Sequence, residues 1–478
     1  RNVGWVTAAP SKVAAGGTLR LAADSIPRNF NPPQTDGAMS EASTILAPTS
    51  GSAVRITADG GWRVDPDYAT SIKVTSKSPL TISVHLNKRA VWQGGTPIRS
   101  KDMVAFWHAQ NGSNSAFKVS STEGFEDIST VKAKGTYAYS VVFKKPVGEW
   151  PQYVYPRLPA NVSSSPKLFN SAFRKRAIPS NGPFNVVSIN TRTGTVTETP
   201  NPRWWGAKPR LSKIVWRIAT PDVQAKAYAA NELDAVDVQA GSYPTVKGSG
   251  TLQTAAGLEW TQLTLNGARG PLKDVNVRRA VAHAVDRRQI ADQAASEVGA
   301  KGTVLGSFVY LPGQLGYHDS AASIAYDPKE SVRLLAKAGY AKNSHGTMVR
   351  KGQALTLTMP VPAKTPTNSE RASSIKRDLK KVGIVVRLRT VPADTFFNSY
   401  VVALNFDLVT FTWRGSAFPV AGTEPLFFPV DSGQNFTGLR DDVLGPAWDK
   451  ANAALDSAKR HEIVRGIDSR LFDDAPMV

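Results

Sequence analysis

The sequence predicts an α/β protein made of two bodies, and three observations lead to that prediction. At 478 residues it is long enough for two or three domains with sizeable cores. Segments with the alternating pattern of strands and segments with helical periodicity follow one another along the chain. Near residues 261–290 a short strand runs directly into two helices, which indicates that the chain passes there from one body to the other.

The first body begins with a strand at Thr18–Ala22 and a loop, 26–33, in which two prolines after Asn31 force an extended turn. A half-buried strand follows at Leu80–Leu86, and Ser100 is placed to cap the next helix. We then expect strands around Val141–Phe143 and at Lys213–Ile218, and a helix over 222–233.

The crossing segment has the clearest local signals. Residues 261–265 alternate with period two, and Gly270-Pro271 marks a turn after them. Asp274 is placed as the N-cap of one helix and Asp286 as the N-cap of a second.

The second body is expected to be mixed in the same way. Asp327-Pro328 opens a helix, and an amphipathic helix over 370–382 ends at Gly383. We expect strands at 355–359, 385–388 and 406–413, and a last helical region over 441–472.

Composition and motifs argue against an enzyme. Hydrophobic residues at 41% and charged residues at 20% are typical of a globular protein, and no apolar stretch approaches the roughly 18 residues of a membrane span. The chain has no cysteine, which excludes disulfides, zinc–thiolate sites and cysteine nucleophiles. It has no hydrolase elbow, P-loop, dinucleotide fingerprint or zincin motif, and its six histidines show no ligand spacing. We therefore expect no catalysis, no metal and no cofactor.

The formal net charge of +20 predicts an anionic partner or surface. Lysines and arginines are spread along the chain, with the densest runs at 174–176 and 380–381, and aromatic residues are not interleaved with them as stacking platforms. This pattern favours a diffuse basic surface facing an anionic membrane or cell wall. The alternative, a nucleic-acid binder, would show steeply salt-dependent affinity.

The crossing segment resembles the hinge-crossing segment of the extracytoplasmic solute-binding proteins of peptide-type ABC importers, family 5. Further matches lie at 62–69, at 89–98, at 181–184 with 201–205, and at 327–340, so the resemblance spans roughly residues 18–478. Ten residues of the crossing segment fall on the family pattern in one register: Asn266, Pro271, Asp274, Val277, Arg278, Ala280, Ala284, Asp286, Arg287 and Ile290.

The resemblance implies the two-lobed periplasmic-binding-protein fold of type II, in the large cluster with an extra subdomain in lobe one. Lobe one would hold residues 1–262, with the subdomain at about 46–180, and lobe two residues 263–475. Leu265 and Asn266 would form the hinge. Residues 476–478 would begin a strand that returns to lobe one and continues beyond the last residue of this sequence.

The resemblance also implies a function. The protein would capture a peptide-like or other oligomeric solute in an inter-lobe cleft by hinge closure and deliver it to an ABC permease. It would be a monomer outside the cytoplasm, attached to the cell envelope by a lipid on a cysteine preceding Arg1, and would not bind nucleic acid.

Two segments are expected to contact the ligand. Asn29, Phe30 and Asn31 match a family loop that borders the cleft, although a purely structural turn is the alternative. The second segment supplies Trp413, Arg414, Ser416 and Phe418. Trp413 matches an aromatic residue of peptide-binding members, and its ring is expected to face the cleft; the alternative is a core tryptophan.

Ser416 departs from the family pattern. Peptide-binding members have there an Asp that pairs with the α-ammonium of the peptide, and this chain has no carboxylate between Asp407 and Glu424. A neutral serine cannot supply the charge-assisted bond that a buried ammonium needs. This departure puts ordinary peptide binding in doubt and leaves a sugar, a glycolipid, a modified peptide or an anion as the ligand.

A second hypothesis is a non-transport envelope scaffold or glycolipid-binding lipoprotein with the same fold. It rests on a weaker likeness to mycobacterial lipoproteins linked to the synthesis of mannosylated phosphatidylinositol, at 29–32 and 64–66. A transporter should close on a small ligand, whereas a scaffold need not.

Overall fold

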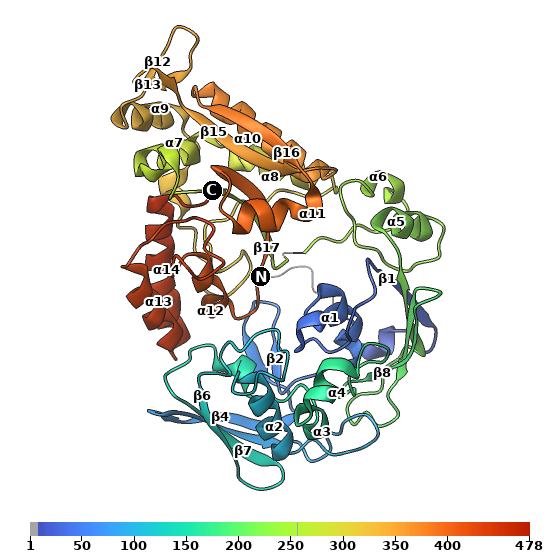
Figure 1. The fold of residues 1–478 in the computed structure, drawn as a ribbon. Helices are drawn as coiled ribbons and strands as arrows, with labels where there is room; N and C mark the ends of the chain where they lie inside the picture. The colour runs from blue at the N-terminus through green and yellow to red at the C-terminus, as the bar shows by residue number, and fades with distance from the viewer. Residues whose placement is uncertain (1–7, 256) are drawn as a thin grey trace. The chain divides into compact units, whose positions relative to one another are not determined.

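The computed structural model describes residues 8–255 and 257–478, and their contacts group into two compact units (Figure 1). The N-terminal unit comprises residues 8–57 and 62–252 of the described chain. The C-terminal unit comprises residues 58–61 and the described residues from 253 to 478.

Two four-stranded sheets form the framework of the N-terminal unit. The first has the order β1-β10-β9-β8, in which β1 runs parallel to β10 and the other neighbours are antiparallel; its strands are β1 (Thr18–Ala23), β8 (Phe184–Asn190), β9 (Thr195–Pro200) and β10 (Lys213–Ile218). The second is antiparallel with the order β4-β5-β7-β6; its strands are β4 (Ala69–Lys77), β5 (Leu80–Leu86), β6 (Ile128–Ala133) and β7 (Ala138–Phe143). A small hairpin pairs β2 (Val54–Ile56) with β3 (Trp62–Val64). The subdomain boundary predicted at 46–180 therefore encloses the second sheet and leaves out the first.

Short helices connect these strands: α1 (Ser40–Leu46), α2 (Ser100–Gln110), α3 (Ala160–Ser163), α4 (Pro166–Ser171), α5 (Pro221–Ala229) and α6 (Tyr243–Val246). Ser100 is the first residue of α2 and not its cap, because Arg99 takes the N-cap position and Asp102 Oδ2 accepts a 2.7 Å hydrogen bond from the Arg99 backbone N–H. Asp102, the third residue of the helix, thus supplies the half of a capping box in which an acidic side chain accepts from the backbone N–H of the N-cap residue.

The C-terminal unit contains two two-stranded sheets and a small meander. β11 (Glu259–Leu265) pairs antiparallel with β17 (Leu408–Arg414) over its full length. β15 (Thr356–Pro362) pairs parallel with β16 (Val385–Val391), and α10 (Pro366–Lys381) connects them and packs on them (Figure 1). The meander consists of β12 (Ala341–Lys342), β13 (Met348–Arg350) and β14 (Gln353–Ala354).

Two successive helices of this unit begin at the predicted caps, whereas α10 begins at Pro366, four residues before the predicted start at 370. Asp274 caps α7 (Val275–Ala284) by accepting from Asn276 N at 2.9 Å, and Asp286 caps α8 (Arg287–Ser296) by accepting from Gln289 N at 2.9 Å. Both predicted caps are confirmed. The remaining helices are α9 (Pro328–Lys337), α11 (Ala393–Thr395), α12 (Pro419–Thr423), α13 (Leu444–Ala453), α14 (Ser457–Asp474) and a π-helix, η7 (Phe396–Val402).

The apolar core of the C-terminal unit lies between its helices and the paired strands. Val277, Ala280 and Val281 of α7 pack with Leu335 of α9 and Leu379 of α10, all fully or almost fully buried. A second cluster surrounds Trp448, Val464 and Phe472 on α13 and α14, which lie side by side in Figure 1. These clusters hold β11 and β17, and therefore the site described below.

The division between the units falls earlier than expected. Contacts separate the chain between residues 252 and 253, whereas lobe one was predicted to end at 262. The whole of β11 belongs to the C-terminal unit, because its partner β17 comes from about 150 residues later in the chain. Leu265 and Asn266 lie inside this unit, and their role as a hinge stays a prediction.

The last three residues pair beside β11. Leu263 and Val478 exchange backbone hydrogen bonds of 3.0 and 2.9 Å, and Met477 forms a bridge with Thr264. Residues 476–478 thus continue the edge of the β11–β17 sheet within the C-terminal unit, and a return to lobe one stays a prediction.

Candidate functional site

Trp413 lies near the end of β17, with its ring half-buried among other aromatic rings. The ring stacks on Phe436 at 9° between planes and 5.7 Å between centroids, and the Phe411 ring is inclined to it by 63°, with 5.1 Å between centroids. The indole Nε1 is buried and has no hydrogen-bond partner in the described residues. The ring of Trp413 therefore packs on aromatic neighbours, while its Nε1 donor has no acceptor among the described residues. Contact of this side chain with a ligand stays a prediction.

The residues after Trp413 form a turn that uses the Ser416 hydroxyl internally. Ser416 Oγ donates to Phe418 O at 2.8 Å and accepts from Phe418 N at 3.2 Å, and the side chain is exposed. Arg414 is also exposed and pairs with Glu259 through the strand register, while Phe418 is half-buried. The structure thus places all four predicted contact residues of this segment in and just after one strand end.

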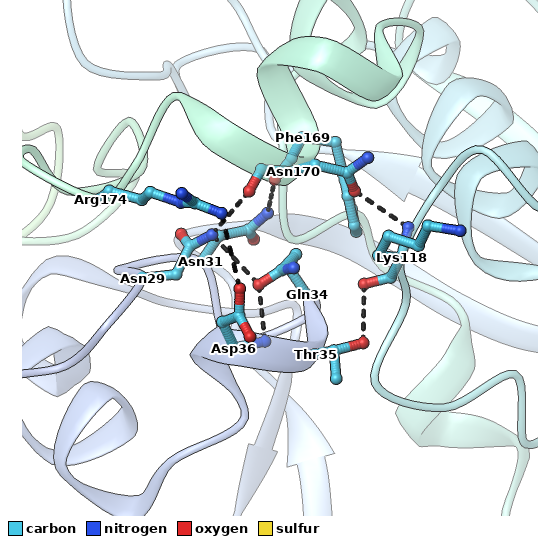
Figure 2. A network of polar contacts seen from close by, with 9 residues as sticks. All are labelled: Asn29, Asn31, Gln34, Thr35, Asp36, Lys118, Phe169, Asn170 and Arg174. Atoms are coloured by element: carbon cyan, nitrogen blue, oxygen red, sulfur yellow. Dashed lines mark hydrogen bonds and ion pairs between the residues drawn. The ribbon is translucent and has the colours of Figure 1, made fainter.

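The other predicted contacts, Asn29, Phe30 and Asn31, lie in the N-terminal unit and are fully buried. Figure 2 shows the two amides pointing at α4: Asn31 Nδ2 donates to Phe169 O at 2.8 Å, and Asn29 Nδ2 donates to Asn170 O at 2.9 Å. Asn29 Nδ2 also lies 3.1 Å from Gln34 Oε1. These bonds fix the shape of the loop, which is the work of a structural turn; a ligand contact stays a prediction.

A cavity of about 690 Å³ lies wholly within the C-terminal unit. Its walls come from β11, β17, α8, α10 and the segment 301–312. Most of the lining is apolar, and four ionisable side chains interrupt it: Glu259, Arg287, Lys301 and Arg371. Three of the four are cationic, so the cavity is biased toward an anionic occupant.

Arg371 is the most constrained of these groups. Its Nε donates to Thr410 Oγ1 at 2.6 Å, and its Nη2 contacts Asn368 Oδ1. Thr410 in turn donates to Gln262 O at 2.7 Å. Burial lowers the pKa of the Arg371 guanidinium to about 10, because the charged form is poorly solvated and no carboxylate compensates.

Sequence reasoning missed this cavity, although one signal pointed to it. Arg371 stands four residues before Ile375, and both line the cavity from α10, whose buried face includes Ala372, Ile375 and Leu379. A cation at a core-facing position of an amphipathic helix is unusual.

The described residues offer no metal centre. Among them, no three histidine, aspartate or glutamate side chains come close enough together to hold an ion. None of the described helices combines the length and apolarity that crossing a bilayer requires.

Comparisons with known proteins place these features in context. Residues 63–434 match the model of bacterial extracellular solute-binding proteins, family 5 Middle. The oligopeptide-binding protein OppA of Mycobacterium tuberculosis is 30% identical over 472 residues, which cover 97% of this chain and 79% of that protein. A probable monoacyl phosphatidylinositol tetramannoside-binding protein, LpqW, of the same organism is 23% identical over 74% of this chain and 60% of its own length.

Among solved structures, the periplasmic EDTA-binding protein EppA superposes with a TM-score of 0.86 and 25% identity, over 97% of this chain and 90% of that chain. The two-lobed α/β architecture expected from the sequence is therefore confirmed.

Proposed function

Because the chain belongs to the bacterial extracellular solute-binding proteins of family 5, the solute-binding components of ABC importers, we propose that it captures a peptide-like or other oligomeric solute without a free α-ammonium group. Its role in transport and its place outside the cytoplasm follow from the family. The class of solute is the part that we propose.

The observation that carries this proposal is the state of Ser416. Its hydroxyl is engaged with Phe418, and no carboxylate occurs from Leu408 to Thr423. A buried ammonium without an acidic partner costs several kcal/mol, enough to erase micromolar affinity. A solute with a blocked or absent amino group avoids that cost.

Two similar proteins bear on the body of the solute. The OppA relative is described as binding oligopeptides, which keeps a peptide-like body in the proposal. The EppA neighbour is described as binding EDTA, a polycarboxylate that is not a peptide.

Calorimetry with matched peptides tests the proposal. We expect N-acetylated tri- to pentapeptides to bind at least about tenfold more tightly than the same peptides with free amino termini. Ser416→Asp should narrow that gap by restoring an acid, whereas Ser249→Asp, an exposed serine in the N-terminal unit, should leave it unchanged. A free peptide whose sub-micromolar affinity vanishes on acetylation would show the proposal to be wrong.

A glycolipid-binding or scaffold role is the second candidate, favoured by the similarity to LpqW over 74% of the chain. Vesicles that contain phosphatidylinositol mannosides would retain the protein if this role is correct, and vesicles of neutral lipid would not.

Attachment through an N-terminal lipid and a monomeric state are further proposals. Detergent partitioning of the native protein would test the attachment, and light scattering would test the monomeric state.

A further inference from the structure

Arg371 is a half-buried cation that forms no ion pair in the described part of the chain. Its two hydrogen-bonded neighbours, Thr410 and Asn368, are both neutral. Its Nη1 has no hydrogen-bond acceptor among the described residues. A guanidinium in this position loses much of its hydration without gaining a counter-charge, which is costly unless another anion completes the site.

We propose that the cavity beside Arg371 binds the carboxylate of a solute whose remaining body is apolar. This inference rests on the proposed function, since it assigns the acidic end of an amino-blocked solute to a place in the C-terminal unit. No free amino terminus is needed in this site.

The guanidinium is already oriented for such a ligand. The bonds from Nε to Thr410 and from Nη2 to Asn368 hold the plane of the group, so little entropy is lost when a carboxylate binds. Arginine and a carboxylate match in a forked geometry, which makes this pairing stronger than one with a neutral oxygen.

Arg287 adds a second positive charge to the lining. Its Nη1 donates to Leu305 O at 2.8 Å, and burial lowers the pKa of this guanidinium. Lys301 and Glu259, the other two ionisable side chains of the lining, are exposed. The two half-buried ionisable side chains of the lining, Arg287 and Arg371, are therefore both cationic.

The rest of the cavity suits an apolar body. Its volume of about 690 Å³ falls in the range of small-molecule sites, roughly 300–1,000 Å³. The apolar wall is formed by α8 and the segment that follows it, with Ile290, Ala294, Val298, Leu305, Phe308 and Leu311.

The segment that carries Phe308 is itself held in place. Asp468 on α14 accepts from Ser307 Oγ at 2.6 Å and from Phe308 N at 2.9 Å. The apolar wall is thus tied to the core of the unit, as a preorganised site requires.

The probe for this inference is N-acetyl-Leu-Leu, compared with its C-terminal amide. We expect the wild-type protein to bind the acid at least about tenfold more tightly than the amide. Arg371→Met should reduce that preference to within about twofold. The matched control is Arg377→Met, because Arg377 is an exposed arginine of the same helix.

Two additions keep the test decisive. Arg371→Lys retains the charge without the forked geometry, and it replaces Arg371→Met if that variant does not fold. We expect its preference for the acid over the amide to lie between those of the wild type and an uncharged variant. Octanoate distinguishes two sources of the carboxylate. If octanoate binds and Arg371→Met abolishes that binding, the site accepts a free acyl acid. If octanoate does not bind while N-acetyl-Leu-Leu binds tightly, the site accepts the carboxyl terminus of a peptide.

Equal affinities for acid and amide in the wild type, or a preference that survives Arg371→Met, would overturn the inference. In either case tight binding of the acetylated peptides would leave the proposed function standing. If the protein binds peptides with free amino termini and not the acetylated peptides, the proposed function is refuted. The dependence of octanoate binding on Arg371 would still test the present inference in that case.

Discussion

The indole of Trp413 lies almost parallel to the ring of Phe436, at 9° between planes and 5.7 Å between centroids. The ring of Phe411, on the same strand, is inclined to the indole by 63°, with 5.1 Å between centroids. Trp413 packs against two apolar clusters of the C-terminal unit at once. The residue that the sequence singles out as a ligand contact thus also has a structural role.

Trp413→Ala should therefore lower the free energy of unfolding by roughly 2–4 kcal/mol, because the stack is lost and a void remains. Trp413→Phe keeps one aromatic ring and should cost clearly less. Urea unfolding measures both effects, and calorimetry with an acetylated peptide measures binding. A Trp413→Ala protein of wild-type stability would show that the stack contributes nothing.

The hydroxyl of Thr410 joins Arg371 to the backbone of β11, since it accepts from Nε at 2.6 Å and donates to Gln262 O at 2.7 Å. Thr410→Val preserves the shape and removes both bonds, so we expect a loss of roughly 1–2 kcal/mol of stability. Binding of N-acetyl-Leu-Leu should weaken as well, because the guanidinium is no longer oriented.

A double-mutant cycle checks this coupling. Thr410→Val in the Arg371→Met background should cost less than in the wild type. Thr412→Val, two residues along the strand with an exposed side chain, is the control. Strictly additive losses would contradict the assigned bond.

Asp468 predicts a pH dependence of stability. Burial raises its pKa to about 7, against the roughly 3.9 of an unfolded chain. The folded protein therefore holds this proton more tightly, and the resulting stability is present below pH 4 and is lost as the pH rises through 7. Between pH 5 and 8 the loss should be roughly 2–3 kcal/mol.

Asp468→Asn keeps an acceptor for the Phe308 N–H, places an amide donor opposite the Ser307 hydroxyl, and cannot ionise. Its stability relative to the wild type should rise between pH 5 and pH 8, as measured by urea unfolding at both pH values. A constant difference between the two proteins would mean that Asp468 does not titrate in this range.

Local chemistry explains which parts of the fold could be predicted. Asp274 and Asp286 were assigned correctly as caps, because a cap depends on backbone groups only two or three residues away. The division between the units was placed about ten residues late, because the position of β11 depends on pairing with the distant β17.

The same distinction holds for the candidate site. The polar loop at Asn29 and Asn31 could be recognised, but its burial depends on carbonyl groups of α4 about 140 residues later. Arg371 was missed because the lack of an acidic partner is a property of the folded surroundings. No local pattern records which distant side chains are absent.

Native mass spectrometry of the protein purified from its own host tests the central claim most directly. We expect a bound solute whose mass is released on unfolding and which does not react with an amine-modifying reagent. A bound solute with a free α-amino group would contradict the account.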